Sequence, residues 1–439
     1  MTVYRSTTSD IGGLWPFLVS HGVPVAGARI GYDTLSGSSF YCSPIDWVLR
    51  SLVANPNLIV FGEPGQGKSS TVVAFLLRMM LFGVRSLVSG DVKGEYSPVA
   101  RALGCEPIIL GSGMTARVNA LDLGPLASRW DGFTAAQQRE AVTGLLGRWV
   151  QLLTALAEAQ GHRVDQTDEM VLAAILRRLT GIRDGNTNLT PVTIPGVHAQ
   201  LARPDEQLWR DTRFGSERQF LDHLRGITDT LGNLISGPLA GLFDAPTNIR
   251  LDWDAPIQTM DLSRLKARGD QAVGVALTVL GSWSATATDL QPDGDIRIVI
   301  RDEVWRQMRL GLKAVQAVDS DIRLSRREKQ IQILVLHKPS DLLTVGDAGS
   351  QEAAIARELM ALCSTRILAG QSTHVASELA EALGLGEEEH RQITGWAMER
   401  RGRALWKLEN RPGFKVQTVL SHVERRLFDT NAQLRRGRR

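Results

Sequence analysis

The beginning of the chain alternates short apolar runs with helical patterns. Apolar runs cover residues 57–61, 84–88 and 107–110, and a helical pattern begins at Thr71, after the first run and a glycine-rich turn. Short apolar runs separated by helical segments are typical of a parallel sheet, because parallel strands need long crossover connections. The pattern therefore predicts an α/β domain.

The pattern changes between residues 134 and 240. Apolar residues there recur at helical spacing, strand-like runs are absent, and turn signals at residues 183–186 and at Thr190–Pro191 divide the segment. We predict an all-helical insertion subdomain over residues 131–240. The apolar positions of its first helix are Val142, Leu145, Leu146, Trp149, Leu152, Leu153 and Leu156.

Strand-like runs resume after the insertion. They cover residues 257–262, 296–300, 331–336 and 365–368, and polar residues follow each run, where an open α/β sheet carries its chemistry. The uncharged run at residues 271–288 predicts a buried helix, since Gly, Ser, Thr and Gln interrupt it too often for a membrane span. The sequence thus predicts a mainly parallel central sheet with an all-helical insertion.

Composition narrows the classes of protein. The 439 residues carry 50 Lys and Arg against 47 Asp and Glu, a net charge of +3, which excludes a nucleic-acid coat protein and a polybasic membrane binder. The three cysteines are widely spaced, which favours a reducing compartment. The N-terminus lacks the apolar core of a secretory signal. We therefore expect a cytoplasmic protein without a transmembrane segment.

A phosphate-binding loop follows the first apolar run. Gly62, Gly67, Lys68 and Ser69 match the G-x-x-x-x-G-K-[ST] pattern between a strand pattern and a helix pattern. Lys68 is expected to reach the β- and γ-phosphates and Ser69 to ligate Mg²⁺, while the glycines turn backbone N–H groups toward the phosphates. The chain uses Arg for 42 of its 50 basic residues. A Lys at position 68 therefore indicates that this place needs a compact ammonium rather than a planar guanidinium. The predicted nucleotide-binding residues are Gly62, Glu63, Pro64, Gly65, Gln66, Gly67, Lys68, Ser69 and Ser70.

A second acidic site is expected at Asp302 and Glu303, which follow the apolar run at residues 296–300. Asp302 is suited to hold Mg²⁺, and Glu303 to polarise the attacking water as catalytic base. A solvated strand end is the alternative, and the complete phosphate loop favours the catalytic interpretation. The predicted activity is ATP hydrolysis with ATP and Mg²⁺ as cofactors, and Lys68 and Glu303 are the main catalytic candidates.

Further motifs occur in order along residues 25–431. They are Asp91-Val-Lys93-Gly-Glu95-Tyr96, Leu103-Gly104 with Val118-Asn119-Ala-Leu-Asp122, Gly241-Leu-Phe-Asp-Ala-Pro-Thr247, Asp302-Glu303-Val-Trp305, Lys338-Pro-Ser-Asp341, and Ser421-His-Val-Glu424 with Phe428-Asp-Thr-Asn431. This order resembles the HerA/FtsK superfamily, and more narrowly the assembly ATPase of type IV secretion and conjugation systems, the fourth VirB component. The resemblance implies an additional-strand, RecA-like P-loop NTPase domain over residues 56–130 and 241–431.

The resemblance also implies roles for Glu95 and His337. Glu95 lies in a segment that borders the nucleotide in the family, where it would position water or metal. Capping of the following helix by Asp91 or Glu95 is an equal alternative. His337 stands where the family's sensor strand usually ends in Gln and would bridge water or the γ-phosphate, and a plain strand-end histidine is the alternative.

Arg366 is the candidate for an arginine that acts on a neighbouring subunit. It lies on the strand from which related motors extend an arginine toward the neighbour's phosphates, which makes hydrolysis depend on ring assembly. Arg401 and Arg403 are the runners-up. A surface or structural role is the alternative for each, because the chain has 42 arginines.

The implied function is a ring motor, a hexamer in the family, that powers DNA conjugation or protein export with channel components at the inner face of the membrane. A HerA-type DNA translocase or helicase is one alternative, and a nucleotide-gated assembly scaffold is another. About 60 residues precede the phosphate loop, so functions of the family's larger N-terminal domain are not carried over. We expect residues 1–55 to pack on the motor and residues 432–439 to form a basic tail.

Overall fold

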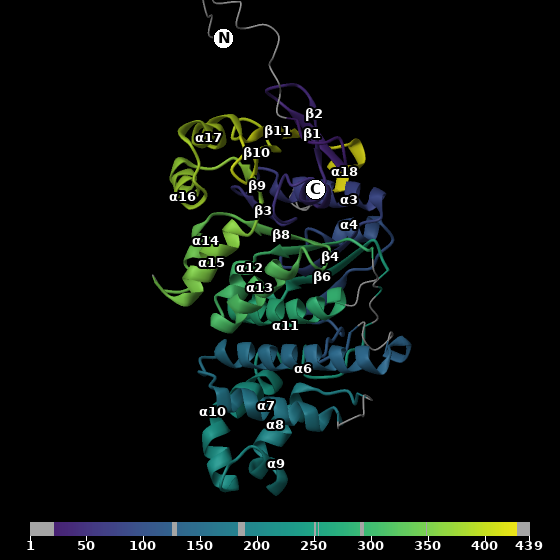
Figure 1. The fold of residues 1–439 in the computed structure, drawn as a ribbon, viewed down its shortest axis with the longest axis vertical. Coiled ribbons are helices and arrows are strands. Elements are labelled where there is room, and N and C mark those ends of the chain that lie inside the picture. Colours follow the sequence, from purple (N-terminus) through teal and green to yellow (C-terminus); the bar gives the residue numbers. More distant parts are fainter. Residues whose placement is uncertain are drawn as a thin grey trace, which may run out of the picture.

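The computed structural model describes residues 22–124, 130–182, 189–249, 252, 254–289, 294–347 and 349–427. A single 11-stranded sheet runs through the upper part of the molecule, and helices cover both of its faces (Figure 1). The basic tail, the end motif at residues 428–431 and the turn signal at residues 183–186 lie outside the described residues.

The phosphate loop and the acidic pair both extend from the parallel part of the sheet. In sheet order its strands are β9 (Thr365–Ala369), β3 (Leu58–Phe61), β8 (Gln330–Leu336), β7 (Arg297–Asp302), β4 (Arg85–Asp91), β6 (Ile257–Arg264) and β5 (Ile108–Gly111). Each neighbouring pair is parallel. β8 separates β3, which leads into the phosphate loop, from β7, which leads into the acidic pair. This is the additional strand that the resemblance implies.

Four antiparallel strands extend the sheet beyond β9. They are β10 (Arg403–Leu408), β11 (Phe414–Thr418), β1 (Ala28–Asp33) and β2 (Ser39–Cys42). None of these four strands was predicted from the sequence, and residues 1–55 were expected only to pack on the motor. Their apolar faces are completed by distant partners, such as Trp406 against Phe40 with ring centroids 5.1 Å apart. Such long-range pairing leaves little signal in the local sequence.

Successive side chains of β3 point to opposite faces of the sheet, so the strand contributes to an apolar cluster on each face. Val60 belongs to the apolar cluster under one set of helices, and Ile59 to the cluster under the other. The first set is α3 (Lys68–Met79) and α4 (Ser97–Ala102), and the second is α13 (Leu312–Leu324), α15 (Gln351–Ala361) and α16 (Thr373–Leu383). Short helices complete this part: α2 (Pro44–Leu49), α12 (Val304–Met308), α14 (Ser340–Leu343), α17 (Glu387–Arg391) and α18 (His422–Leu427).

A layer of helices lies beyond the sheet at the lower end of Figure 1. It consists of α6 (Ala135–Glu158), α7 (Gln166–Leu179), α8 (Ile194–Ala202), α9 (Glu206–Asp211) and α10 (Glu217–Ser236). α6 packs on α11 (Asp270–Asp289), the helix expected from the uncharged run, and Leu152 and Leu280 belong to one apolar cluster. The helical layer therefore joins the sheet through a continuous core. The predicted fold class, α/β with a mainly parallel sheet and an all-helical insertion, is confirmed.

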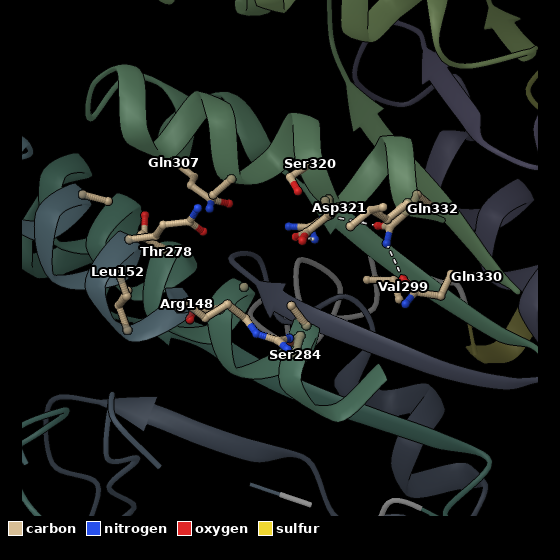
Figure 2. A pocket seen from close by; sticks show the side chains of 18 of the residues that line it. Arg148, Leu152, Thr278, Ser284, Val299, Gln307, Ser320, Asp321, Gln330 and Gln332 are labelled. Atoms are coloured by element: carbon tan, nitrogen blue, oxygen red, sulfur yellow. Dashed lines mark hydrogen bonds and ion pairs between the residues drawn. The ribbon is translucent and has the colours of Figure 1, made fainter. Parts of the chain in front are cut away.

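A cavity of about 240 Å³ lies where α6, α11 and α13 meet β7 and β8 (Figure 2). Arg301 forms an ion pair with Asp321 there, and its Nε donates a hydrogen bond to Gln332 Oε1 at 3.0 Å. None of the described residues that line the cavity belongs to the phosphate loop or the acidic pair. Among the described helices, none combines the length and the apolar character that crossing a membrane needs.

Candidate nucleotide site

The phosphate loop connects β3 to α3 at the carboxyl edge of the parallel strands. Gly65 has φ 84° and Gly67, the N-cap of α3, has φ 93°, a left-handed conformation that favours glycine. A Cβ on Gly62 would lie 2.7 Å from Ala369 Cβ, and one on Gly67 would lie 2.9 Å from the backbone nitrogen of Gly402. The shape of the loop and the segments packed against it therefore require these glycines.

The remaining loop residues either form hydrogen bonds with neighbouring segments of the chain or are exposed to solvent. Glu63 Oε1 accepts a hydrogen bond from the backbone N–H of Ser372 at 2.8 Å, and the Gln66 carbonyl accepts one from Gly402 at 3.0 Å. In the first turn of α3, Ser70 Oγ donates to the Gly67 carbonyl at 3.0 Å. Pro64 and Gly65 are exposed, and Ser69 is half-buried at the start of α3.

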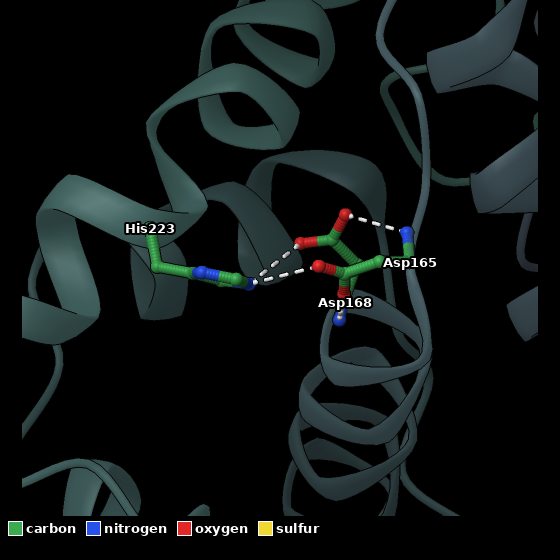
Figure 3. A group of neighbouring side chains, drawn as sticks. All are labelled: Asp165, Asp168 and His223. Atoms are coloured by element: carbon green, nitrogen blue, oxygen red, sulfur yellow. Dashed lines mark hydrogen bonds and ion pairs between the residues drawn. The ribbon is translucent and has the colours of Figure 1, made fainter.

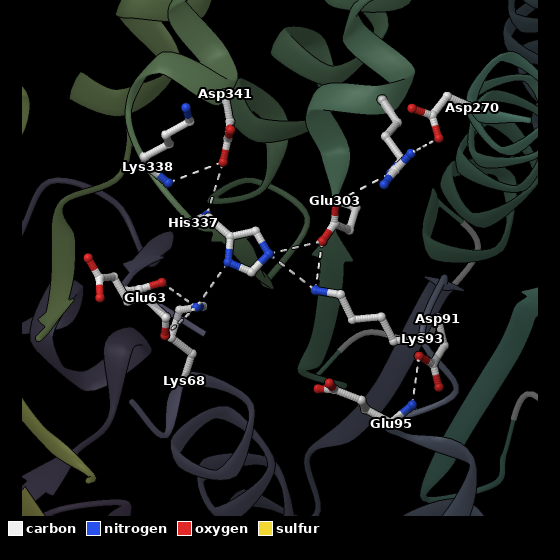
Figure 4. Close-up of polar contacts among 12 residues, drawn as sticks. Glu63, Lys68, Asp91, Lys93, Glu95, Asp270, Glu303, His337, Lys338 and Asp341 are labelled. Atoms are coloured by element: carbon white, nitrogen blue, oxygen red, sulfur yellow. Dashed lines mark hydrogen bonds and ion pairs between the residues drawn. The ribbon is translucent and has the colours of Figure 1, made fainter. Parts of the chain in front are cut away.

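Lys68 lies folded over the loop that precedes it. Its ammonium donates to the carbonyls of Gly62 and Glu63, the latter at 3.2 Å, and lies 3.2 Å from His337 Nδ1 (Figure 4). Burial, and next the charge of Lys93, lower the pKa of Lys68 to about 8, although the carboxylates of Asp302, Glu95 and Glu303 oppose this shift. Lys68 thus folds back onto the carbonyls of its own loop and also contacts His337.

The acidic pair ends β7 at the same sheet edge. Asp302 is 4% exposed, and burial raises its pKa to about 7; the charge of Lys93 opposes this rise, and the carboxylates of Glu303, Glu95 and Asp91 add to it. Glu303 has φ 57° and forms the N-cap of α12. A left-handed backbone at a non-glycine residue is strained, and such residues cluster at functional sites.

Three basic side chains surround the carboxylate of Glu303. Lys93 Nζ lies 2.7 Å from Oε1, His337 Nε2 lies 3.2 Å from the same oxygen, and Arg306 Nε lies 3.3 Å from Oε2 (Figure 4). Burial alone raises the pKa of Glu303, but the hydrogen bonds from His337 and Lys93 outweigh it and hold the pKa well below its usual range. Glu303 is therefore an ionised carboxylate in this arrangement.

His337 connects Lys68 to Glu303. Nδ1 lies 3.2 Å from the Lys68 ammonium, which can only donate, and Nε2 lies 3.2 Å from Glu303 Oε1 and 3.3 Å from the Lys93 ammonium. The tautomer with the hydrogen on Nε2 satisfies Lys68 and Glu303, and Lys93 then donates to Glu303 rather than to the imidazole. The backbone N–H of His337 donates to Asp341 Oδ2 at 3.1 Å, and the His337 carbonyl accepts from Gln371 Nε2 at 3.1 Å. These contacts fix the end of β8 against the phosphate loop.

Asp91 and Glu95 lie at the end of the neighbouring strand β4. Asp91 accepts hydrogen bonds from the backbone N–H groups of Glu95 at 2.9 Å and of Tyr96 at 2.8 Å. Burial raises the pKa of Asp91 to about 6, against these hydrogen bonds. Glu95 Oε2 is enclosed and accepts no hydrogen bond from the described residues. Asp91 thus orders the turn before α4, and Glu95 keeps a free oxygen beside Asp302 and Lys68.

The three candidate arginines lie in different surroundings. Arg366 pairs with Ile59 across the sheet, two residues before the end of β3, and is half-buried. Burial lowers its pKa, against the effects of Cys363, Glu409 and Glu389. Arg401 is exposed beside Gly402, which contacts the phosphate loop. Arg403 is bound to Glu399 at 2.6 Å. Arg366 is not among the residues that meet around Lys68 within the described chain.

The contact of Lys93 with Glu303, the contact of Gln371 with His337 and the contact of Gly402 with the loop were not predicted. The one sequence signal for Lys93 is that it is one of eight lysines in a chain with 42 arginines and stands inside a motif. Gln371 and Gly402 are brought to the loop by β9 and by the start of β10, and the pairing of these strands is long-range.

A parallel sheet with one strand between the phosphate-loop strand and the acidic strand defines the additional-strand class of P-loop NTPase folds. Solved structures share this fold. VirB4 of Thermoanaerobacter pseudethanolicus matches with a TM-score of 0.70 at 16% identity, over 92% of this chain and 100% of that one. The bacterial conjugative coupling protein TrwB matches with a TM-score of 0.57 at 13% identity, over 91% of this chain and 90% of that one.

A structure of TrwB in complex with ADP and Mg²⁺ gives a TM-score of 0.56 at 14% identity, over 91% of this chain and 96% of that one. Sequence comparison finds no matching family model and no matching curated protein. The shared fold confirms the fold that the order of motifs implied.

The two shifted pKa values predict how nucleotide binding depends on pH. The pKa of Asp302 is raised to about 7, so a Mg²⁺ ion held by this carboxylate would have to displace a proton and would bind more weakly as the pH decreases. The pKa of Lys68 is lowered to about 8, so a phosphate held by this ammonium would bind more weakly as the pH rises. We expect the affinity for MgADP, measured by calorimetry, to be highest between these values. In Asp302→Asn the acid limb should shrink to the part that protonation of the ADP phosphates contributes. An acid limb as steep as that of the wild type would contradict the assignment.

Proposed function

We propose that this chain is an ATP-hydrolysing ring motor of a type IV secretion or conjugation system. The observation that carries the proposal is the meeting of Lys68, Asp302, Glu303 and His337 at one sheet edge, in a fold matched by VirB4 over 92% of this chain. Its RecA-like ATPase domain comprises residues 56–130 and 241–431, with the helical insertion over residues 131–240 between them.

ATP and Mg²⁺ fit the residues present. Gly62 and Gly67 keep the loop clear of side chains, Lys68 supplies a charge there, and the donor set of Ser69 and Asp302 offers the oxygen ligands that Mg²⁺ prefers. When bound, Mg²⁺ neutralises charge on the phosphates. The unsatisfied Oε2 of Glu95 can accept a hydrogen bond from water in the same site.

Glu303 is the proposed base that accepts a proton from the attacking water. In the present arrangement Oε1 accepts from Lys93 and His337, whereas Oε2 accepts from Arg306 alone and keeps a lone pair for a water. His337 touches both Lys68 and Glu303, and movement of Lys68 onto phosphate oxygens would therefore free Nδ1 of the imidazole. His337 thereby connects occupation of the loop with the hydrogen bonding of Glu303.

We further propose that the chains assemble as a ring in which Arg366 acts on the neighbouring subunit. Arg366→Ala should then lose turnover but keep MgADP binding, because its own phosphate loop is intact. Mixing it with Glu303→Gln, which keeps Arg366 but lacks the base, should restore part of the turnover in mixed rings. Arg401→Ala tests the runner-up in the same way, and Arg425→Ala, at an exposed site, is the control. Failure of the mixture to recover activity would leave Arg366 with a structural role in the sheet.

The DNA-translocase alternative is tested by DNA-stimulated ATPase activity across a salt series. Binding to the phosphate backbone weakens as salt rises, so stimulation that is large at low salt and lost at high salt would favour DNA as the cargo. Absence of stimulation at low salt would favour protein export. In either case, we propose that association with the membrane occurs through channel components at its inner face, on the cytoplasmic side.

A further inference from the structure

A second group of polar side chains lies in the helical layer, where α7 begins beside α10. Asp165 is the N-cap of α7, Asp168 lies in its first turn, and His223 projects from α10 toward both carboxylates (Figure 3). One ligand atom from each of the three residues lies within 4.8 Å of the others. None of these residues contacts the phosphate loop, so the group is separate from the nucleotide site.

The capping of α7 uses one oxygen of each carboxylate. Asp165 Oδ1 accepts from the backbone N–H groups of Thr167 at 2.7 Å and Asp168 at 2.9 Å, and Asp168 Oδ2 accepts from the backbone N–H of Asp165 at 3.2 Å. The second oxygen of each residue faces His223 Nε2 instead: Asp165 Oδ2 lies 3.4 Å from it and Asp168 Oδ1 lies 3.9 Å from it. As a result, Oδ2 of Asp165, Oδ1 of Asp168 and Nε2 of His223 point toward one another.

Asp168 is the strongest indication of a missing ligand. Its side chain is 3% exposed, and Oδ1 is enclosed and accepts no hydrogen bond from the described residues. A buried carboxylate oxygen without a donor is costly unless a cation or a hydrogen-bond donor reaches it. His223 Nε2 is within weak hydrogen-bonding reach of Asp165 Oδ2, but its distance of 3.9 Å from Asp168 Oδ1 exceeds that of a hydrogen bond. A tetrahedral ion with bonds of about 2.1 Å would separate its ligands by about 3.4 Å.

A second histidine, His162, contacts the other oxygen of the Asp168 carboxylate. His162 Nε2 lies 3.0 Å from Asp168 Oδ2 and so fixes the carboxylate with Oδ1 directed toward His223. Room for this imidazole is made by Gly226 on α10, where a Cβ would lie 2.4 Å from His162 Nδ1. A hydrogen-bonded group that orients a ligating carboxylate is typical of metal sites.

We propose that Asp165, Asp168 and His223 bind a Zn²⁺ ion. One imidazole nitrogen with two carboxylate oxygens suits zinc better than Mg²⁺ or Ca²⁺, which prefer oxygen ligands only. The side chains of Asp165 and His223 are 55% and 37% exposed, so water can complete the coordination. The ion ties the start of α7 to α10 and thereby stiffens the helical layer.

The test uses the full chain, stripped of metal by a chelator and then titrated with Zn²⁺, with Mg²⁺ titrated in parallel. We expect about one zinc ion per chain and a rise in melting temperature that Mg²⁺ does not give. His223→Ala should weaken zinc binding by at least about tenfold. Asp165→Asn should also weaken it while keeping the helix cap, because Asn caps helices as well as Asp does.

His374→Ala is the matched control, since this histidine is 88% exposed on α16, and it should bind zinc as the wild type does. Melting without zinc shows that each variant is folded. Lack of saturable zinc binding by the wild type, or unchanged affinity in His223→Ala, would overturn the proposal and identify the group as an imidazolium between two carboxylates. Mg²⁺-dependent ATPase activity should be the same in all these variants, so this result is independent of the proposed function.

Discussion

We expect Glu303→Gln to lower ATP turnover by at least about 100-fold and to leave MgADP binding within about twofold of the wild type. The amide keeps the size and the hydrogen-bonding reach of the side chain but cannot take a proton from water. Glu303 is 4% exposed at the end of β7, and among the described residues it is the carboxylate that contacts all three of Lys93, His337 and Arg306.

The measurement is phosphate release at saturating ATP, together with calorimetric binding of MgADP. Glu381→Gln, an exposed substitution on α16, is the matched control and should retain full turnover. Turnover of Glu303→Gln within about threefold of the wild type would assign the base to another residue. Loss of MgADP binding as well would indicate damage to the site rather than to the chemical step.

Lys68→Arg is the second substitution with a large expected effect, although it keeps the charge. Lys68 is 7% exposed, and its stem is so close to the loop that a Cβ on Gly62 would lie 3.1 Å from Lys68 Cγ. A planar guanidinium is wider than an ammonium and cannot make the same contacts with phosphates in this space. We expect turnover to fall by about 100-fold.

Lys338→Arg is the control for this substitution, because Lys338 is exposed one residue after His337 and its side chain lies outside the loop. Both variants are compared by phosphate release and by MgADP affinity. If Lys68→Arg turned over ATP as fast as Lys338→Arg, the proposed need for a compact ammonium in the loop would be wrong.

The sequence predicted the parallel part of the sheet because its signals are local. β3 is a short buried run followed directly by Gly62, and β7 is one that ends in Asp302 and is followed by Glu303. Each strand and its functional residues therefore stand in one short stretch of sequence, and β8 is likewise a buried run, followed by His337. The long helix α11 was visible for the same reason, as an uninterrupted uncharged run.

The antiparallel strands and the contacts of Glu303 depend on pairing between distant segments. β1 is held by β11 through residues such as Tyr32 and Gln417, almost the length of the chain apart. Lys93 reaches Glu303 only because β4 lies next to β7 in the sheet, although more than 200 residues separate the two side chains along the chain. The order of strands cannot be read from local patterns, and neither can the contacts that it creates.

The most direct test of the central claim is phosphate release by the wild-type chain with ATP and Mg²⁺, measured over a series of protein concentrations. We predict turnover that requires Mg²⁺ and whose rate per chain rises as the concentration increases, since assembly brings the neighbouring subunit to the site. If the chain bound ATP at every concentration but released no phosphate, the proposal of a motor would be wrong. The alternative of a nucleotide-gated scaffold would then be favoured.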